Sequence, residues 1–449
     1  MIWDYYDTLT TLTAVSAAVA CVLPGLWLVL RRHSMMGDAI AHAALLGIVG
    51  AFLAVSAVES SGLIDEDAHE LAYSVALFVG ATLTGLLTAF LTEWLSRVGR
   101  LDPGAALGVV FSSLFALGML LVRLAADSAH IDLDCVLFGD ISSSLFDVLP
   151  GTLLTRAAAV NLAAFALNAA LTTLLFKELR ISSFDADHAA ALGIRPRLMH
   201  YLLLTMTAIT VVAAFRTVGS ILVIALLTVP AATALLLTRS LRSAVAVAFA
   251  VAIAAGTLGH LAARTLPPVV FAGWGIRDVS TSGMVCVVAG ALFAVAWLLS
   301  PRGGLLPSRW RQLSTTIDVA AEDLLGGLWR LEERDRLADQ QTLLDVVGRR
   351  FGAGRWLMRL ARHRLRDRGH LRLDDGIWTL TEPGREAARK LIRAHRLWET
   401  YLAKHFGIPG EHLHEAAMRA EHYIDPALAD QIEAELDQPR RDPHGRAIP

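Results

Sequence analysis

The sequence lacks the patterns that mark disulfide-rich, zinc-ribbon or nucleotide-hydrolysing proteins. Its 449 residues include three cysteines, Cys21, Cys135 and Cys286, with no CxxC spacing, which excludes a disulfide framework and a zinc ribbon. No GxxxxGK[ST] motif occurs, so we expect no ATP binding or hydrolysis by this chain alone. The start, MIWDYYD, has no basic region and no A-x-A cleavage site. We therefore expect the first apolar run to be a retained helix, not a secretory signal.

Charge is also scarce, and it is unevenly distributed. The chain is 55% hydrophobic and 18% charged, with a formal net charge of −2. Charged residues are sparse from Thr8 to Leu299 and dense from Arg302 to Pro449. This contrast predicts a membrane portion followed by a soluble portion.

Long apolar runs fill the first portion. A helix that crosses a bilayer needs about 20 mainly apolar residues. Nine runs meet this length, near 9–30, 37–57, 72–95, 104–124, 154–176, 198–215, 217–238, 242–263 and 279–299. The two runs beside Arg216 have almost no connection between them, so eight spans with a re-entrant segment is the alternative.

Basic residues lie at alternate ends of these runs and predict the orientation. Cytoplasmic loops are enriched in Lys and Arg. The predicted cytosolic set is Arg31, Arg32, Arg97, Arg100, Lys177, Arg180, Arg195, Arg197, Arg239, Arg242, Arg302 and Arg309. The loops near Glu59–Glu70 and Asp127–Asp134 are acidic or neutral. The N-terminus then faces outside, and the soluble portion faces the cytosol.

Lys177–Ile194 is a short polar stretch between two apolar runs. Its Ala-rich centre predicts a short helix that Ser183 or Asp185 caps and Gly193 ends. On the cytosolic side, such a loop suits the docking of another protein. An ordinary connector is the alternative.

Asp38 and His42 have a spacing that places both side chains on one helix face. Ionisable groups within a membrane segment are costly and suggest a function, here contact with a divalent cation in transit. The alternative is a structural Asp–His hydrogen bond near the interface.

The segment Leu30–Ala43, LRRHSMMGDAIAHA, resembles manganese/zinc/iron-type ABC transporter permeases, which carry R-x-S-x-x-G-D-A-x-x-H-A there. Further matches follow in order at 106–118, 137–141 (LFGDI), 183–185 (SFD), 191–194 (ALGI) and 218–234, so the likeness covers about residues 8–303. The resemblance implies import of a divalent metal delivered by an extracytoplasmic metal-binding protein. It implies a cytosolic ATP-binding subunit docked on Ser183, Phe184, Asp185, Ala191, Leu192 and Gly193. A second permease copy or a paralogous permease and membrane lipid are the other expected partners.

The soluble portion begins with three predicted helices, 319–333, 341–350 and 354–368. Alternating residues 371–373 and 377–380 around Asp375-Gly376 predict a β-hairpin. This order is typical of a winged helix-turn-helix, in which Arg355, Arg359 and Arg362 would contact DNA. The alternative is a winged fold for protein contact with solvated arginines.

Two further predicted helices, 383–406 and 412–424, carry metal-binding side chains at helical spacing. These are His395, Glu399, His414, Met418, Glu421 and His422. Packed side by side, the helices would bring together imidazole, carboxylate and thioether groups that suit Fe²⁺, Mn²⁺, Co²⁺, Ni²⁺ or Zn²⁺. Surface residues without a ligand are the alternative.

The stretches 395–399 (HRLWE), 414–422 (HEAAMRAEH) and 443–449 (PHGRAIP) resemble the diphtheria-toxin-repressor family of metal-dependent regulators. The resemblance covers about residues 317–449 and implies one metal site at His395, Glu399 and His414. It implies a second at Met418, Glu421 and His422 with Asp323, and dimerisation through these helices. Met418 stands where iron-type members have Cys and Asp323 where they have Met, so the metal stays open. Gly354–Met358 lacks the Ser/Thr-rich start of the family's recognition helices, which disfavours sequence-specific DNA binding.

The sequence thus predicts a mainly α protein with a transmembrane domain at 1–303, a linker at 304–316, a winged helix at 317–384 and a helical metal-binding domain at 385–449. We expect a multi-pass, non-enzymatic permease of the bacterial inner membrane that imports manganese, zinc or iron and senses the metal in the cytosol. A metal-dependent repressor, tethered or cleaved near Arg302–Ser314, is the alternative. A non-transporting membrane scaffold is a third possibility.

Overall fold

The computed structural model describes residues 3–59, 69–125, 141, 147–270, 279–301, 303–333, 343–345, 347, 355–374, 377–408 and 410–449. These residues form two compact units, Met1–Pro307 and Ser308–Pro449. The LFGD stretch, the acidic loops, most of the predicted helix 341–350 and the Asp375-Gly376 turn lie outside the described residues.

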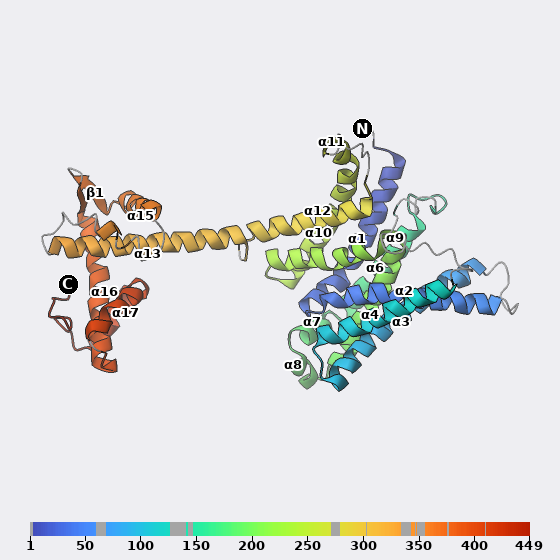
Figure 1. Ribbon diagram of the computed structural model, residues 1–449, viewed down its shortest axis with the longest axis horizontal. Coiled ribbons are helices and arrows are strands. Elements are labelled where there is room, and N and C mark those ends of the chain that lie inside the picture. Colours follow the sequence, from blue (N-terminus) through green and yellow to red (C-terminus); the bar gives the residue numbers. More distant parts are fainter. Residues whose placement is uncertain are drawn as a thin grey trace. The chain divides into compact units, whose positions relative to one another are not determined.

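Helices make up the first unit (Figure 1). They are α1 (Tyr5–Leu30), α2 (Ser34–Glu59), α3 (His69–Gly99), α4 (Pro103–Ala125), α6 (Arg156–Leu174), α7 (Phe176–Phe184), α8 (Ala186–Ala191), α9 (Pro196–Leu237), α10 (Leu241–Thr265), α11 (Pro267–Val270) and α12 (Thr281–Leu299). Within the described residues, nine segments are long and apolar enough to cross a membrane. The nine predicted runs are therefore confirmed as helical segments.

Helix α9 contains two of these segments without a loop between them. The sequence predicts a connection at Arg216, but the backbone leaves helical geometry at Gly219, where φ is 75° and ψ is 168°. Glycine adopts positive φ at little cost because it has no Cβ. The break therefore falls at the nearest glycine and not at the charged residue.

Small residues let the membrane helices approach closely. At Gly47 on α2, a Cβ atom would lie 2.2 Å from the carbonyl oxygen of Gly80 on α3. Such contacts are typical of membrane proteins, in which helices associate mainly through backbone packing. The main apolar core joins α1, α9, α10 and α12 and includes the fully buried Leu26, Val218 and Ala252.

Two ionisable residues of α10 bind a buried carboxylate of α1. His260 Nε2 lies 3.1 Å from Asp7 Oδ1, and Arg264 forms an ion pair with the other oxygen of Asp7. From the sequence alone, His260 and Arg264 are an i, i+4 pair near the end of an apolar run, for which we expect packing and extension of the charged group toward the surface. The partner on α1 is a finding that helix spacing does not predict.

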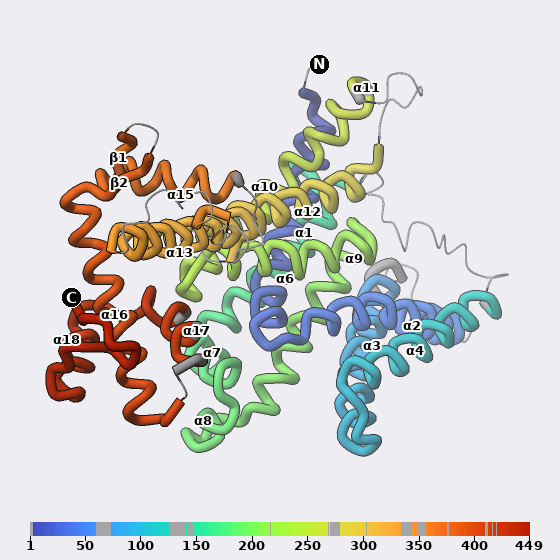
Figure 2. Tube along the Cα trace, turned by 60° about the vertical axis from the view of Figure 1, so that its left-hand side comes forward, coloured from blue at the N-terminus to red at the C-terminus, as the bar shows by residue number. Residues whose placement is uncertain are grey.

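The second unit consists of α13 (Leu305–Glu333), α15 (Arg355–Asp367), β1 (Leu371–Asp374), β2 (Ile377–Leu380), α16 (Glu382–Phe406), α17 (Gly410–Ala420), the 3₁₀ turn η5 (Glu421–Tyr423) and α18 (Pro426–Glu435). The segment predicted as a linker, 304–316, is helical from Leu305, where α13 begins. The first unit ends at Pro307, within this helix. The tube in Figure 2 follows this chain from α13 to α18.

The β-hairpin is confirmed. Strands β1 and β2 are antiparallel, with Leu371 opposite Leu380 and Asp374 opposite Ile377. Leu371 and Leu380 are buried with Leu357 and Leu365 of α15 in one apolar cluster, which also contains residues of α13. The hairpin, α15 and α13 therefore share a core.

Candidate metal centre

Helix α16 positions two of the predicted ligands. Thr381 caps its start by accepting a hydrogen bond from the Gly384 N–H, and Gly407, with φ of 60°, follows its end. Because His395 and Glu399 are four residues apart, their side chains lie on one face. Both are buried, with 3% and 2% of their surface exposed.

Helix α17 adds a third ligand to this pair. His395 Nε2 lies 3.0 Å from both Glu399 Oε1 and His414 Nδ1, and His414 Nδ1 lies 3.1 Å from Glu399 Oε1. The side chain of His414 is half exposed. These three atoms form a nearly equilateral triangle, to which His395 and Glu399 contribute from buried side chains and His414 from a half-exposed one.

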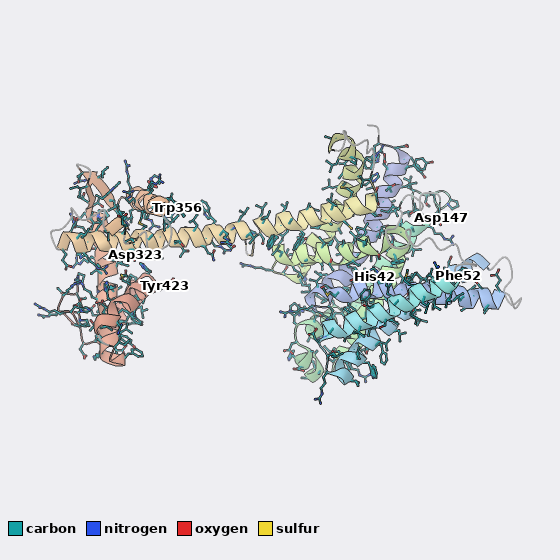
Figure 3. The ribbon with its side chains drawn as sticks, viewed as in Figure 1. His42, Phe52, Asp147, Asp323, Trp356 and Tyr423 are labelled. Carbon is teal, nitrogen blue, oxygen red and sulfur yellow. The ribbon has the colours of Figure 1, made fainter. Side chains whose placement is uncertain are left out.

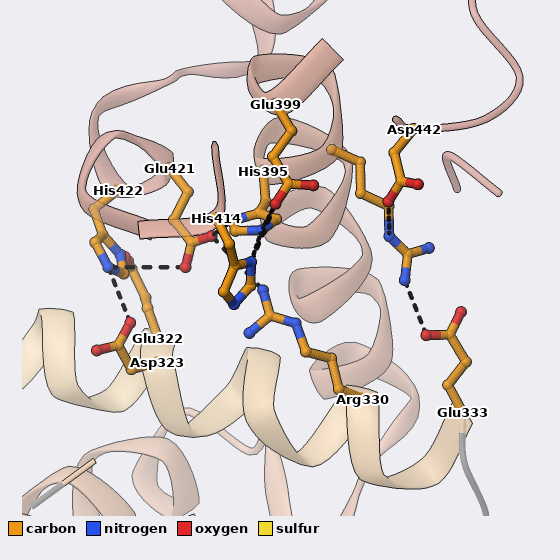
Figure 4. A network of polar contacts seen from close by, with 11 residues as sticks. Glu322, Asp323, Arg330, Glu333, His395, Glu399, His414, Glu421, His422 and Asp442 are labelled. Carbon is orange, nitrogen blue, oxygen red and sulfur yellow. Dashed lines mark hydrogen bonds and ion pairs between the residues drawn. The ribbon is translucent and has the colours of Figure 1, made fainter. Parts of the chain in front are cut away.

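A second group forms where α17 ends. The chain changes at Glu421 to the 3₁₀ turn η5, so Glu421 and His422 do not continue the predicted α-helix. A 3₁₀ turn has three residues per turn and directs side chains differently. His422 Nε2 lies 3.2 Å from Asp323 Oδ1 of α13 and 4.0 Å from Glu421 Oε1 (Figure 4).

Two contacts in this region were not predicted from the sequence. His422 Nδ1 lies 2.7 Å from Glu322 Oε2, and Arg330 Nη2 lies 4.0 Å from Glu421 Oε2. Both partners come from α13, about 100 residues earlier in the case of Glu322. The acidic and basic positions of α13 were the available signal, but their spacing does not reveal a partner so distant in the chain.

Contacts within the cluster shift the pKa values of two histidines, His395 and His422, and of one carboxylate, Glu399. Burial lowers the pKa of His422, but its hydrogen bonds with Asp323 and Glu322 outweigh this effect and raise the pKa to about 9. His395 behaves alike: burial lowers its pKa, and the contacts with Glu399 and Glu421 raise it further than burial lowers it. For Glu399, burial raises the pKa, yet the bonds with His395 and His414 hold it well below its usual range.

The donor atoms fit a divalent transition metal. Three atoms on one face of an octahedron, each about 2.1 Å from a metal, lie about 3.0 Å apart. The triangle of His395, Glu399 and His414 has this size. In each of the two groups, the ligand atoms, one from each residue, lie within 4.8 Å of one another. Two nitrogens with one carboxylate oxygen suit manganese, iron or zinc. Met418, the remaining predicted ligand, lies on α17 with a partly buried side chain.

The predicted membrane pair is also formed. His42 Nε2 lies 3.2 Å from Asp38 Oδ1 on α2, and 44% of the Asp38 side chain is exposed. The rings of Phe111 and Phe115 of α4 lie 5.6 Å from the His42 ring. Figure 3 labels His42 in the membrane unit and Asp323 in the second unit.

The predicted docking stretch folds as two short helices. Asp185 is the cap between α7 and α8 and accepts a hydrogen bond of 2.9 Å from the His188 N–H. Ser183 does not cap, because its hydroxyl accepts a hydrogen bond from Arg31 Nε and donates to a carbonyl within α7. Phe184 and Leu192 are 69% and 55% exposed, and Ala191 and Gly193 are exposed as well.

The predicted DNA-contacting arginines lie on α15. Arg359 is exposed, whereas the guanidinium of Arg362 lies 5.7 Å from the centre of the Trp378 ring on β2. The side chain of Arg355 lies outside the described residues. Arg364 of this helix and Arg368, which follows its end, form ion pairs with Asp318 of α13.

Comparison with known proteins finds two families along the chain. The ABC 3 transport family matches residues 6–300. The iron dependent repressor, metal binding and dimerisation domain matches residues 381–449, which contain both α16 and α17.

Several relatives match the membrane unit. The manganese transport system membrane protein MntD of Bacillus subtilis is 36% identical over 308 residues, which cover 67% of this chain and 95% of MntD. The zinc transport system membrane protein TroD of Treponema pallidum is 38% identical over 303 residues, 66% of this chain and 74% of TroD. The solved structure of PsaBC from Streptococcus pneumoniae in complex with Fab aligns with a TM-score of 0.53 and 26% identity, over 69% of this chain and 96% of that one. The chain therefore belongs to the ABC 3 transport family: it is a multi-pass permease subunit whose ATP hydrolysis lies on a partner chain, and it carries a fused metal-binding and dimerisation domain of the iron dependent repressor type.

Proposed function

We propose that this permease imports manganese, zinc or iron and that its C-terminal domain binds the same metal in the cytosol and reduces further uptake. The observation that carries the proposal is the convergence of His395, Glu399 and His414 beside Asp323, Glu421 and His422 in a chain whose first two thirds is an ABC permease. A sensor on the same chain as the transporter responds to the product of transport without a diffusing messenger.

The first group holds one metal ion and the second group, with Met418, holds another. Neutral imidazole and carboxylate are ligands for all three candidate metals, and selection among them depends on geometry and availability. Asp323 supplies a hard oxygen where a sulfur ligand would favour softer metals, which supports manganese as the first metal to test.

Within the membrane unit, Asp38 and His42 contact the metal in transit. Their position on one face of α2 and the partial exposure of Asp38 support this role. The ATP-binding subunit docks on Ser183–Gly193, where Phe184 and Leu192 present apolar side chains to a partner. These assignments require both the docking stretch and the C-terminal domain to face the cytosol, as the positions of the basic residues predict.

Uptake of radiolabelled Mn²⁺ into vesicles that contain the permease and its ATP-binding subunit tests the proposal. With metal loaded inside the vesicles, the wild-type rate should fall, and a His395→Ala/His422→Ala variant should keep its rate. The exposed His363, which pairs with Asp367 on α15, provides the control His363→Ala. Equal sensitivity of all three proteins to internal metal would refute feedback by this domain.

A second candidate function is metal-dependent DNA binding by a winged helix of α13, α15 and the hairpin. The supporting observation is the exposed Arg359 on an Arg-rich helix directly before the hairpin. The contacts of Arg362, Arg364 and Arg368 with protein groups reduce the positive charge available for phosphates. Binding of labelled promoter DNA to the full chain at low salt, measured with and without Mn²⁺, tests this function. It requires that Mn²⁺ increase the affinity for DNA and that Arg359→Ala weaken it.

A further inference from the structure

Arg330 is the one cationic side chain of α13 that the described contacts place against the ligand groups. Its Nη2 atom is buried, has no hydrogen-bond partner among the described residues and lies 4.0 Å from Glu421 Oε2. Figure 4 shows the side chain reaching from α13 toward His414 and Glu421. Its length and direction place positive charge beside the ligands, although a guanidinium cannot coordinate a metal.

The surroundings of Arg330 are strongly acidic. Glu421 and Glu399, both almost fully buried, contribute most of the negative potential at Arg330, and Asp323 adds to it. Burial lowers the pKa of Arg330 more than these carboxylates raise it, but the pKa of a guanidinium is so high that the group remains charged. Buried carboxylates without a counter-charge are costly, and a nearby cation offsets this cost.

A divalent ion in either ligand group would supply the same counter-charge. Metal and guanidinium would then repel each other across the same carboxylates. Even at the dielectric constant of water, a unit charge several ångströms from a divalent ion changes its binding about tenfold.

We infer that Arg330 is an internal counter-ion that stabilises the metal-free cluster and sets the metal threshold of the domain by competing with the incoming ion. This inference rests on the proposed metal sites. It assigns Arg330 a role in metal affinity through Glu421 and Glu399, not as a ligand.

Two measured quantities, the stability of the metal-free chain and its affinity for metal, distinguish this role from a purely structural one. Replacing a purely structural arginine would change both in the same direction. Without the guanidinium, the metal-free protein loses a counter-charge and becomes less stable, while the metal-bound protein loses a repulsion. Arg330→Gln should therefore lower the thermal midpoint of the metal-free chain and at the same time bind metal more tightly.

The experiment uses the full chain in detergent, with free Mn²⁺ followed by its electron paramagnetic resonance signal during titration. We expect Arg330→Gln to bind Mn²⁺ about tenfold more tightly than wild type, and Arg330→Lys, which keeps the charge, to stay close to wild type. Arg393→Gln is the matched control, because Arg393 is similarly exposed but pairs with Asp430 and Glu433 on α18. If Arg330→Gln does not fold, Arg330→Met keeps the apolar stem and serves the same test.

Unchanged or weaker Mn²⁺ binding by the uncharged variants would overturn the inference. A His395→Ala/His422→Ala chain in the same titration separates this failure from failure of the metal sites. If that chain binds as much Mn²⁺ as wild type, the proposed sites are wrong. If it binds less while Arg330→Gln binds as wild type does, the sites stand and the counter-ion role is wrong.

Discussion

His395 Nδ1 lies 2.5 Å from Glu421 Oε2, so one imidazole ring connects the two ligand groups. The other ring nitrogen, Nε2, belongs to the triangle with Glu399 and His414. A histidine that binds a metal through one nitrogen usually donates its other N–H to a carboxylate, which fixes the ring and strengthens the ligand. Glu421 therefore serves both groups, as a candidate ligand of one and as the orienting partner of the other.

Glu421→Gln should weaken metal binding at both groups. It removes an anionic ligand from the second group and the charged partner of His395 in the first, and loss of such a partner typically costs 10–100-fold in affinity. Stepwise Mn²⁺ titration of the full chain measures both losses. Glu386→Gln is the control, because Glu386 lies on α16, as His395 does, but pairs with Lys390 at the exposed surface. An effect confined to one binding step would contradict the link through His395.

Metal affinity should rise with pH between about 6 and 9. The pKa of His422 is raised to about 9, so this ring carries a proton at pH 7 that metal must displace. The pKa of His395 is also raised, which adds to the same competition between proton and metal. Each displaced proton makes affinity up to about tenfold stronger per pH unit. Calorimetric titration in buffers of different ionisation enthalpy measures the protons released, and a pH-independent affinity with no release would contradict the assignment.

The stability of the metal-free domain has the opposite pH dependence. Because the pKa of His422 is higher in the folded chain than its ordinary value of 6.5, protonation stabilises the fold. This contribution is complete below pH 6.5 and disappears as the pH rises through about 9. Thermal unfolding at pH 7 and pH 9.5 should show the loss in wild type and a smaller change in His422→Gln.

The sequence predicted well the features that depend on local spacing. His395 with Glu399, and Asp38 with His42, follow from the helical period, and both pairs are in contact. The sequence did not predict that α17 would give way to a 3₁₀ turn at Glu421, because the contacts made there, such as those of His422 with Glu322 and Asp323, come from a distant part of the chain. Glu322 and Arg330 were missed for the same reason, since their partners come from a distant part of the chain.

The close contact of α2 with α3 should tolerate no side chain at Gly47. A Cβ atom there would lie 2.2 Å from the Gly80 carbonyl oxygen, so Gly47→Ala must separate the helices and should cost roughly 1–3 kcal/mol. Gly50→Ala, on the same helix with nothing within 4 Å of the new atom, is the control. The thermal midpoints of the two variants in detergent should differ by several degrees, and equal midpoints would show that this contact is unimportant.

The cap at Asp185 should matter for the partner subunit more than for the fold. Asp185→Ala removes the hydrogen bond to the His188 N–H at the start of α8, a loss of about 1 kcal/mol for a capping residue. Because α8 has six residues and little other support, this loss should disorder the surface around Leu192 and weaken co-purification of the ATP-binding subunit. Asp187→Ala is the control, since Asp187 lies in the first turn of α8 but does not make the cap. Retention of the subunit by Asp185→Ala at wild-type levels would mean that docking does not depend on this helix.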